Sequence, residues 1–267
     1  MNTTQYNGGR TADTSRGFSP GIWADCPVLE IIHGIKQGII LADDFVNGPR
    51  VAAGAEAVAG LYRGFASTGG LVADGGEWGG TLNLSSDGDD EGASLRTSTN
   101  PFQISRNHGK LWFEARVKSS TVDDDKHGLF VGLRADAALT VIDPIAADGT
   151  LADGNFVGFH RLEGDGDAID TVYKANGVGQ ETVGSDAITI AEDTYVKVGF
   201  VFNPADYKLT FFSNGVKLPD TYTVISAAGT EFPNDVRLGL VIAVLNATAT
   251  SPGSSKIDWW RCAQLAA

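Results

Sequence analysis

The sequence predicts an all-β protein, an antiparallel β-sandwich preceded by an extended N-terminal arm. Its composition, with 34 Gly, nine Pro and 42% hydrophobic residues, suits many short strands joined by turns. Several segments alternate apolar and polar residues with a period of two, which is typical of strands that pack one face on a core. A chain of 267 residues fits one large sandwich. We therefore expect an arm over residues 1–41 and one β-sandwich domain over residues 42–267.

The clearest element is a pair of linked hairpins over residues 194–218, TYVKVGFVFNPADYKLTFFSNGVKL. The turn residues of 203–206 separate its first two strands, and Asn214-Gly215 supplies the pair of positive φ angles that a tight second turn needs. One face of the first strand is apolar and should form core: Val196, Val198, Phe200 and Phe202.

Further strands are predicted on both sides of this hairpin. They are KLWFEARVK (110–118), GLFVGLRA (128–135), NFVGFHRL (155–162), IDTVYKA (169–175), VRLGLVIAVL (236–245) and SKIDWWRCAQL (255–265). Residues 135–154 contain Pro144 and repeated Asp-Gly pairs, so we expect a long irregular surface loop there.

The first 41 residues do not follow the strand pattern. Residues 1–26 are polar and read as an extended arm, whereas Pro27 to Leu41 is abruptly apolar. This apolar segment either folds back as an edge strand of its own domain or packs on a partner. The candidate assembly residues are Phe18, Ile22, Trp23, Val28, Leu29, Ile31, Ile32, Ile35, Ile39 and Ile40.

The formal charge of −13 disfavours a nucleic-acid partner, because such binding depends on Lys and Arg that neutralise phosphates. No apolar run is long enough to span a membrane, and the first residues contain no signal-peptide core, so neither a membrane partner nor classical secretion is expected. Cys26 and Cys262 lack metal-binding spacing and are expected to be free thiols, although the sequence leaves open whether they pair.

The strand segments resemble the concanavalin A-like lectin/glucanase jelly roll, which includes laminin G-like domains. The matching pieces cover residues 42–263: Asp43-Asp44-Phe45, GKLWFEARVKSS, GLFVGLRA, NFVGFHRLEGDG, DTYVKVGFVFNPADYKLTFFSNGVKL and IDWWR. The resemblance implies two antiparallel sheets packed face to face. It also implies a choice of functions, since the family contains sugar-binding lectins, glucanases, adhesion modules and structural domains of bacteriophage virions.

Catalysis is not expected. Glucanases of this fold resemble one another in a strand motif Glu-x-Asp-x-x-Glu, which this chain lacks. The nearest candidate, residues 163–170, is interrupted by two glycines and belongs in a loop. No zinc-protease motif, nucleophile elbow or phosphate-binding loop is present.

Three acidic clusters are candidates for Ca²⁺, the one cofactor considered, because closely spaced carboxylates are the ligands it prefers. The alternative is that each cluster is a solvated acidic turn, and none matches a complete EF-hand loop. The candidate ligands are Asp87, Asp89, Asp123, Asp125, Glu163, Asp165 and Asp167.

Trp78 and Trp112 are candidates for stacking on a sugar ring. Trp112 alternates away from the apolar face of its strand, so it is expected to face outwards. The alternative is that it packs in a second layer of the sandwich.

The main functional hypothesis is a non-enzymatic virion protein of a tailed bacteriophage that decorates or cements the head through its arm. Its expected location is the virion, its partner the major capsid protein, and its state a homo-oligomer, with a trimer suggested by capsid geometry. The alternative is a carbohydrate-binding module or receptor-binding virion component, and a glycoside hydrolase is the third hypothesis.

Overall fold

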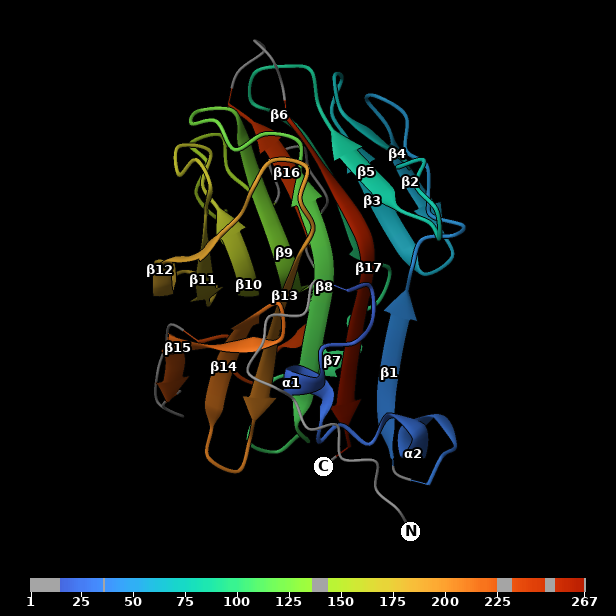
Figure 1. The fold of residues 1–267 in the computed structure, drawn as a ribbon, viewed down its shortest axis with the longest axis vertical. Coiled ribbons are helices and arrows are strands. Elements are labelled where there is room, and N and C mark those ends of the chain that lie inside the picture. The colour runs from blue at the N-terminus through green and yellow to red at the C-terminus, as the bar shows by residue number, and fades with distance from the viewer. Residues whose placement is uncertain (1–14, 36, 136–143, 225–231, 248–252, 267) are drawn as a thin grey trace.

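The computed structural model describes residues 15–35, 37–135, 144–224, 232–247 and 253–266, and no side chains for 219–224. Two antiparallel β-sheets pack face to face, as Figure 1 shows. This confirms the predicted all-β sandwich.

The first sheet has the order β15-β14-β13-β8-β17-β5-β4, and β1 pairs with the second half of β17. Its strands are β1 (Gly38–Asp43), β4 (Leu71–Asp74), β5 (Leu82–Ser85), β8 (Leu111–Ser119), β13 (Val196–Asn203), β14 (Lys208–Ser213), β15 (Val216–Val224) and β17 (Ser254–Leu265).

The second sheet has the order β12-β11-β10-β9-β16-β6-β3-β2, with β7 paired to the start of β16. Its strands are β2 (Glu56–Ala59), β3 (Tyr62–Ala66), β6 (Glu91–Thr97), β7 (Phe102–Gln103), β9 (His127–Ala135), β10 (Phe156–Arg161), β11 (Ala168–Lys174), β12 (Glu181–Thr189) and β16 (Arg237–Asn246).

The main core lies between the sheets and uses the faces that period-two alternation predicts. The apolar face of β13 is buried in it, with Phe113 of β8 stacked on Phe200 at a ring-centroid distance of 5.0 Å. Asn214 and Gly215 have φ angles of 48° and 76°, which confirms the predicted turn between β14 and β15.

A smaller apolar cluster covers the outer face of the second sheet. Ile145 and Leu151, from the described part of the 135–154 segment, pack there on outward-facing side chains that include Phe130 and Phe156. The described residues 144–155 are irregular, as predicted, but Ile145 and Leu151 are buried because the outer face of this sheet is apolar and needs a cover.

The N-terminal segment differs most from its prediction. Helix α1 (Pro20–Trp23) lies across the outer face of β8 and β13, and helix α2 (Val28–Ile32) leads into β1. Ile22, Trp23 and Ile31 are buried against the domain, so these three predicted assembly residues are not available to a partner in this conformation.

The rest of the predicted assembly set is more accessible. Of the segment from Pro27 to Leu41, the structure shows the alternative of an edge strand for residues 38–41, because β1 pairs with β17, and the expected domain boundary after Leu41 falls inside β1. Val28 and Ile40 are half-buried, and the exposed members are Phe18, Leu29, Ile32, Ile35 and Ile39.

The two helices are four and five residues long, and no described helix has the length and apolar character of a membrane span. Cys26 and Cys262 are both free thiols, as predicted.

Candidate functional site

The Trp78 loop, residues 75–80 with the sequence GGEWGG, joins β4 to β5 and holds the most exposed aromatic side chain of the described residues. Trp78 is 91% exposed. Gly80 has a φ angle of 87°, and a Cβ there would lie 2.4 Å from the carbonyl oxygen of Asp44. Glycine is therefore required for the loop to lie this close to the chain that follows β1.

Two basic side chains fasten the backbone of the Trp78 loop. Arg16 Nη2 donates to the carbonyl oxygens of Gly79 and Gly80 at 2.6 and 3.2 Å, and its Nε donates to Asp258 on β17 at 2.7 Å. From the other side, Lys256 Nζ donates to the carbonyl oxygen of Gly75 at 2.9 Å. The Arg16 guanidinium also lies 5.7 Å from the centre of the Trp78 ring, within cation–π range.

Glu77 anchors the same loop through its side chain. It accepts hydrogen bonds from Tyr195 at 2.9 Å and from Lys256 at 3.1 Å, and it forms an ion pair with Lys118 at 2.9 Å. Desolvation, the largest single influence, raises the pKa of Glu77, but the bonds from Lys118, Lys256 and Tyr195 together outweigh it and lower the pKa to about 2. The carboxylate therefore stays charged and its contacts persist at any ordinary pH.

Trp112, the other predicted sugar contact, is only 1% exposed. Its side chain does point away from the main core, but α1 covers it and its Nε1 donates to Asp25 at 2.9 Å. The outward orientation was predicted correctly and the exposure was wrong, because a segment 90 residues earlier in the chain forms a second layer over this face. The packed alternative is the one that the structure shows.

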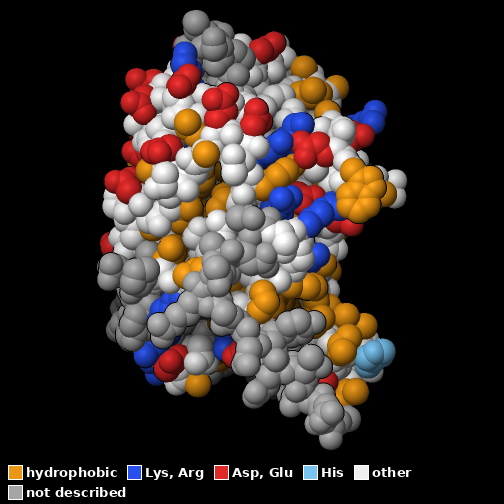
Figure 2. Space-filling model, viewed as in Figure 1, with side chains coloured by type: hydrophobic (Ala, Val, Ile, Leu, Met, Phe, Trp, Pro, Cys, Tyr) orange, Lys and Arg blue, Asp and Glu red, His pale blue; other side chains and the backbone are white. Residues whose placement is uncertain are grey.

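The three predicted acidic clusters meet at one end of the molecule, which we call the acidic end. They occupy the turns between β5 and β6 (86–90), β8 and β9 (120–126), and β10 and β11 (162–167). Figure 2 shows Asp and Glu side chains gathered toward this upper end. Desolvation first, and then repulsion from Asp90 and Asp125, raises the pKa of Glu163, which shows that carboxylates of all three turns act on one another.

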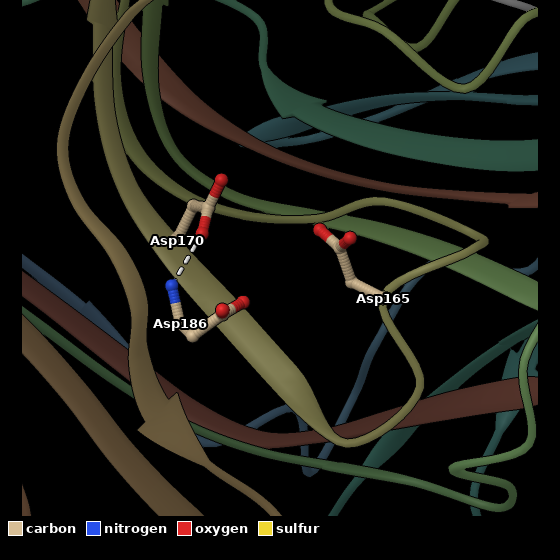
Figure 3. Close-up of side chains that lie close together, drawn as sticks. All are labelled: Asp165, Asp170 and Asp186. Atoms are coloured by element: carbon tan, nitrogen blue, oxygen red, sulfur yellow. Dashed lines mark hydrogen bonds between the residues drawn. The ribbon is translucent and has the colours of Figure 1, made fainter.

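Asp165, Asp170 and Asp186 form the tightest carboxylate group among the described residues. One oxygen from each lies within 4.8 Å of the others, and Figure 3 shows the three side chains converging from two strands and a loop. Asp170 Oδ1 accepts a hydrogen bond from the backbone nitrogen of Asp186 at 2.8 Å. Desolvation first, and then neighbouring carboxylates, raises the pKa values of Asp165 and Asp170. Three oxygens at this spacing can contact a cation, although exposed acidic groups are common without one.

A buried arginine provides positive charge at the acidic end. Arg161 is fully buried, and its guanidinium donates to the carbonyl oxygens of Gly166, Thr121 and Asp123 at 2.6, 2.9 and 3.3 Å. Burial lowers its pKa, while Asp124 and the other surrounding carboxylates favour the charged form. Arg161 therefore links the 120–126 turn to the 162–167 turn.

The sequence missed several residues of both sites. Arg16, Lys256 and Tyr195 are far from the Trp78 loop along the chain, and no local pattern connects them with it. Asp186 joins Asp170 because the pairing of β11 with β12 is irregular between Ile169 and Thr171. For Asp170 alone there was a signal, since it ends the acidic run that begins at Glu163.

Strand β10 carries no Asp or Glu, and its outward-facing residues Phe156 and His160 are buried. An apolar cluster thus occupies the outer face of this strand.

No protein-family model matches the chain, and no curated protein matches it. Solved structures match its fold. One is a protein of unknown function from Shewanella oneidensis MR-1, with 13% identity, a TM-score of 0.56, and coverage of 95% of this chain and 97% of that chain.

Two further matches have named activities. SCLam, a non-specific endo-β-1,3(4)-glucanase from family GH16, is 12% identical with a TM-score of 0.55, covering 99% of this chain and 100% of that chain. The potassium-bound carbohydrate recognition domain of Emp46p is 14% identical with a TM-score of 0.51, covering 73% of this chain and 88% of that domain. Identities this low show the fold alone. The chain therefore has the concanavalin A-like jelly-roll fold that these lectin and glucanase structures share.

Proposed function

We propose that this protein is a carbohydrate-binding, lectin-like module that binds glycans by stacking a sugar ring on Trp78. The observation that carries the proposal is the exposed indole of Trp78 on an ordered loop. Arg16 and Lys256 bind the backbone of this loop, and Tyr195 binds the side chain of its Glu77. An aromatic ring offers a large rigid apolar face, and a loop that is already ordered loses little entropy when a ligand binds. The shared fold with a carbohydrate recognition domain supports the same proposal.

Polar groups next to the indole suit a hydroxylated ligand. Glu77 precedes Trp78 in the loop, and the Arg16 guanidinium lies beside the ring. A sugar ring stacked on Trp78 would have the Arg16 guanidinium beside it as a charged donor, whereas the Glu77 carboxylate is already bound by Tyr195, Lys256 and Lys118. A polar group placed beside an apolar face gives such a binding site specificity.

The test is a glycan array followed by titration of the best soluble oligosaccharide, with tryptophan fluorescence as the readout. The other four tryptophans are buried, so a ligand that covers Trp78 should shift emission and protect it from acrylamide quenching. Trp78→Ala should weaken binding by about tenfold or more, and Trp78→Tyr should retain part of it. Val58→Ala, at an exposed apolar residue on β2, is the matched control and should bind normally. Equal affinity of Trp78→Ala and the unmodified chain would refute this site.

The same oligosaccharides test the expectation that the protein is not an enzyme. Chromatography after long incubation should show intact substrate, and any shorter product would contradict a purely binding role. Repeating the titration with calcium at constant ionic strength tests the predicted ligands of the acidic end, which remain a prediction.

The virion hypothesis also remains a prediction, including the major capsid protein as partner. Its main argument was an apolar arm without a place in its own domain. The burial of Ile22, Trp23 and Ile31 in the domain weakens that argument. Of the similar structures named above, those with a named role are a carbohydrate recognition domain and a glucanase, so the carbohydrate-binding alternative is the better supported of the two.

A further inference from the structure

An apolar patch surrounds α2 and the start of β1. Leu29, Ile32, Ile35 and Ile39 are 69%, 60%, 72% and 41% exposed. Figure 2 shows hydrophobic side chains gathered at the lower right, where Figure 1 places α2 and β1. Four large aliphatic side chains within eleven residues are more than the scattered exposure that a monomer normally shows, and such patches mark interaction surfaces.

Strand β1 adds an open sheet edge to this patch. Among the described residues it pairs with β17, and its other backbone edge has no strand partner. Proteins usually protect such an edge with Lys or Pro, but Gly38–Asp43 (GIILAD) contains neither. An edge without these protecting residues is suited to pairing with another strand.

The charge distribution favours a copy of the same chain at this end of the molecule. A net charge of −13 opposes self-association in general. However, the three acidic turns lie at the acidic end, whereas α2 and β1, which carry one carboxylate each in Glu30 and Asp43, lie toward the opposite end, as Figures 1 and 2 show. Two copies joined through α2 and β1 would therefore keep their acidic ends far apart, beyond the range of strong repulsion.

The segment that precedes the described residues does not supply an obvious cover for the patch. Residues 1–14, MNTTQYNGGRTADT, contain no Leu, Ile, Val, Phe or Trp. A segment of this composition has little apolar surface to offer to Leu29, Ile32 and Ile35, so the cover is better sought in a second molecule.

We infer that this protein forms a two-fold symmetric dimer in which β1 pairs antiparallel with β1 of a second copy and the two α2 patches pack together. Both features are self-complementary: an antiparallel edge pairs with itself across a two-fold axis, and an apolar patch packs on its own copy. The first sheet then continues across both molecules, and the contact closes at two copies.

The experiment is sedimentation equilibrium of the full chain without ligand, combined with hydrogen exchange of the β1 amides. The unmodified chain should be a dimer at micromolar concentration, with β1 amides protected. Leu29→Lys and Ile32→Lys replace exposed side chains, so they should leave the fold intact, raise the dimer dissociation constant at least about tenfold, and speed exchange in β1. Val58→Lys, at an equally exposed residue on the edge strand β2, is the matched control and should leave the dimer unchanged.

Three results would overturn the inference. A monomer at all accessible concentrations would show that the protein does not dimerise. A trimer would contradict two-fold edge pairing, and a dimer broken by Val58→Lys but not by Ile32→Lys would place the contact on the other sheet. None of these results depends on glycan binding, so the inference and the proposed function stand or fall separately.

Discussion

His127 illustrates how one buried side chain makes stability depend on pH. It is fully buried, with Nδ1 2.9 Å from Asn246 Oδ1 and Nε2 2.8 Å from Ser255 Oγ. Burial is the largest influence and lowers its pKa to about 4, although the bond to Asn246 opposes the shift. An unfolded histidine has a pKa near 6.5, so protons bind the unfolded chain first. Stability is therefore retained at about pH 7 and lost as the pH falls from about 6.5 toward 4.

We predict that His127→Gln reduces this loss. Glutamine cannot take up a proton, so the free energy of unfolding should depend less on pH in the variant, by about 3 kcal/mol across that window. Urea unfolding at a series of pH values measures the effect. His33→Gln, at an exposed histidine, is the control and should follow the unmodified chain. Parallel pH profiles for His127→Gln and the unmodified protein would contradict the prediction.

At the scale of elements, α1 behaves as part of the domain. Trp23 Nε1 donates to Glu114 Oε2 at 2.7 Å, and the backbone nitrogen of Ser19 donates to the same oxygen at 3.2 Å. Burial raises the pKa of Glu114, whereas these bonds oppose the rise. The approach is close enough that a Cβ on Gly199 would lie 2.6 Å from Ile22 Cδ1 and 2.7 Å from the carbonyl oxygen of Phe113, so β13 needs glycine under the helix.

Trp23→Phe should therefore destabilise the whole domain. Phenylalanine keeps most of the apolar contact but removes the donor to a buried carboxylate, which costs about 1–3 kcal/mol. The midpoint of urea unfolding should fall accordingly. The identical substitution at exposed Trp78 is the control, with an expected change below about 0.5 kcal/mol. If both substitutions had the same small effect, α1 would not be docked in solution.

Single strands were more predictable than the layers that cover them. Period-two alternation identified β8 and β13 and the turn at Asn214-Gly215, because these depend on neighbours within a few residues. The same pattern gave the direction of Trp112 but not its burial, since the covering helix comes from residues 20–23. For the Trp78 loop the sequence indicated an aromatic candidate, whereas its anchors Arg16 and Lys256 are brought there only by the tertiary fold.

At the scale of the whole molecule, the charges are unevenly distributed. The acidic end combines three turns, and carboxylates of the other two turns contribute, after desolvation, to the raised pKa of Glu163, while the buried Arg161 compensates part of that charge. Aliphatic side chains collect instead at the end that holds α2 and β1. Repulsion between carboxylates is therefore strongest at one end of the sandwich, and the exposed apolar surface lies at the other end.

Removal of one negative charge from the acidic end should stabilise the protein. Desolvation and then Asp186 raise the pKa of Asp165, so at about pH 7 the repulsion on the ionised Asp165 works against folding, and this penalty disappears as Asp165 becomes protonated in acid. Asp186 has a φ angle of 51°, which asparagine also accepts, so Asp186→Asn removes charge without backbone strain. We expect the melting temperature to rise by about 1–2 °C at low salt and about pH 7. The gain should shrink in about 0.5 M NaCl, where screening already weakens the repulsion, and also near pH 4. Thermal unfolding under these three conditions is the measurement, and a gain that persisted at high salt would mean that charge is not its cause.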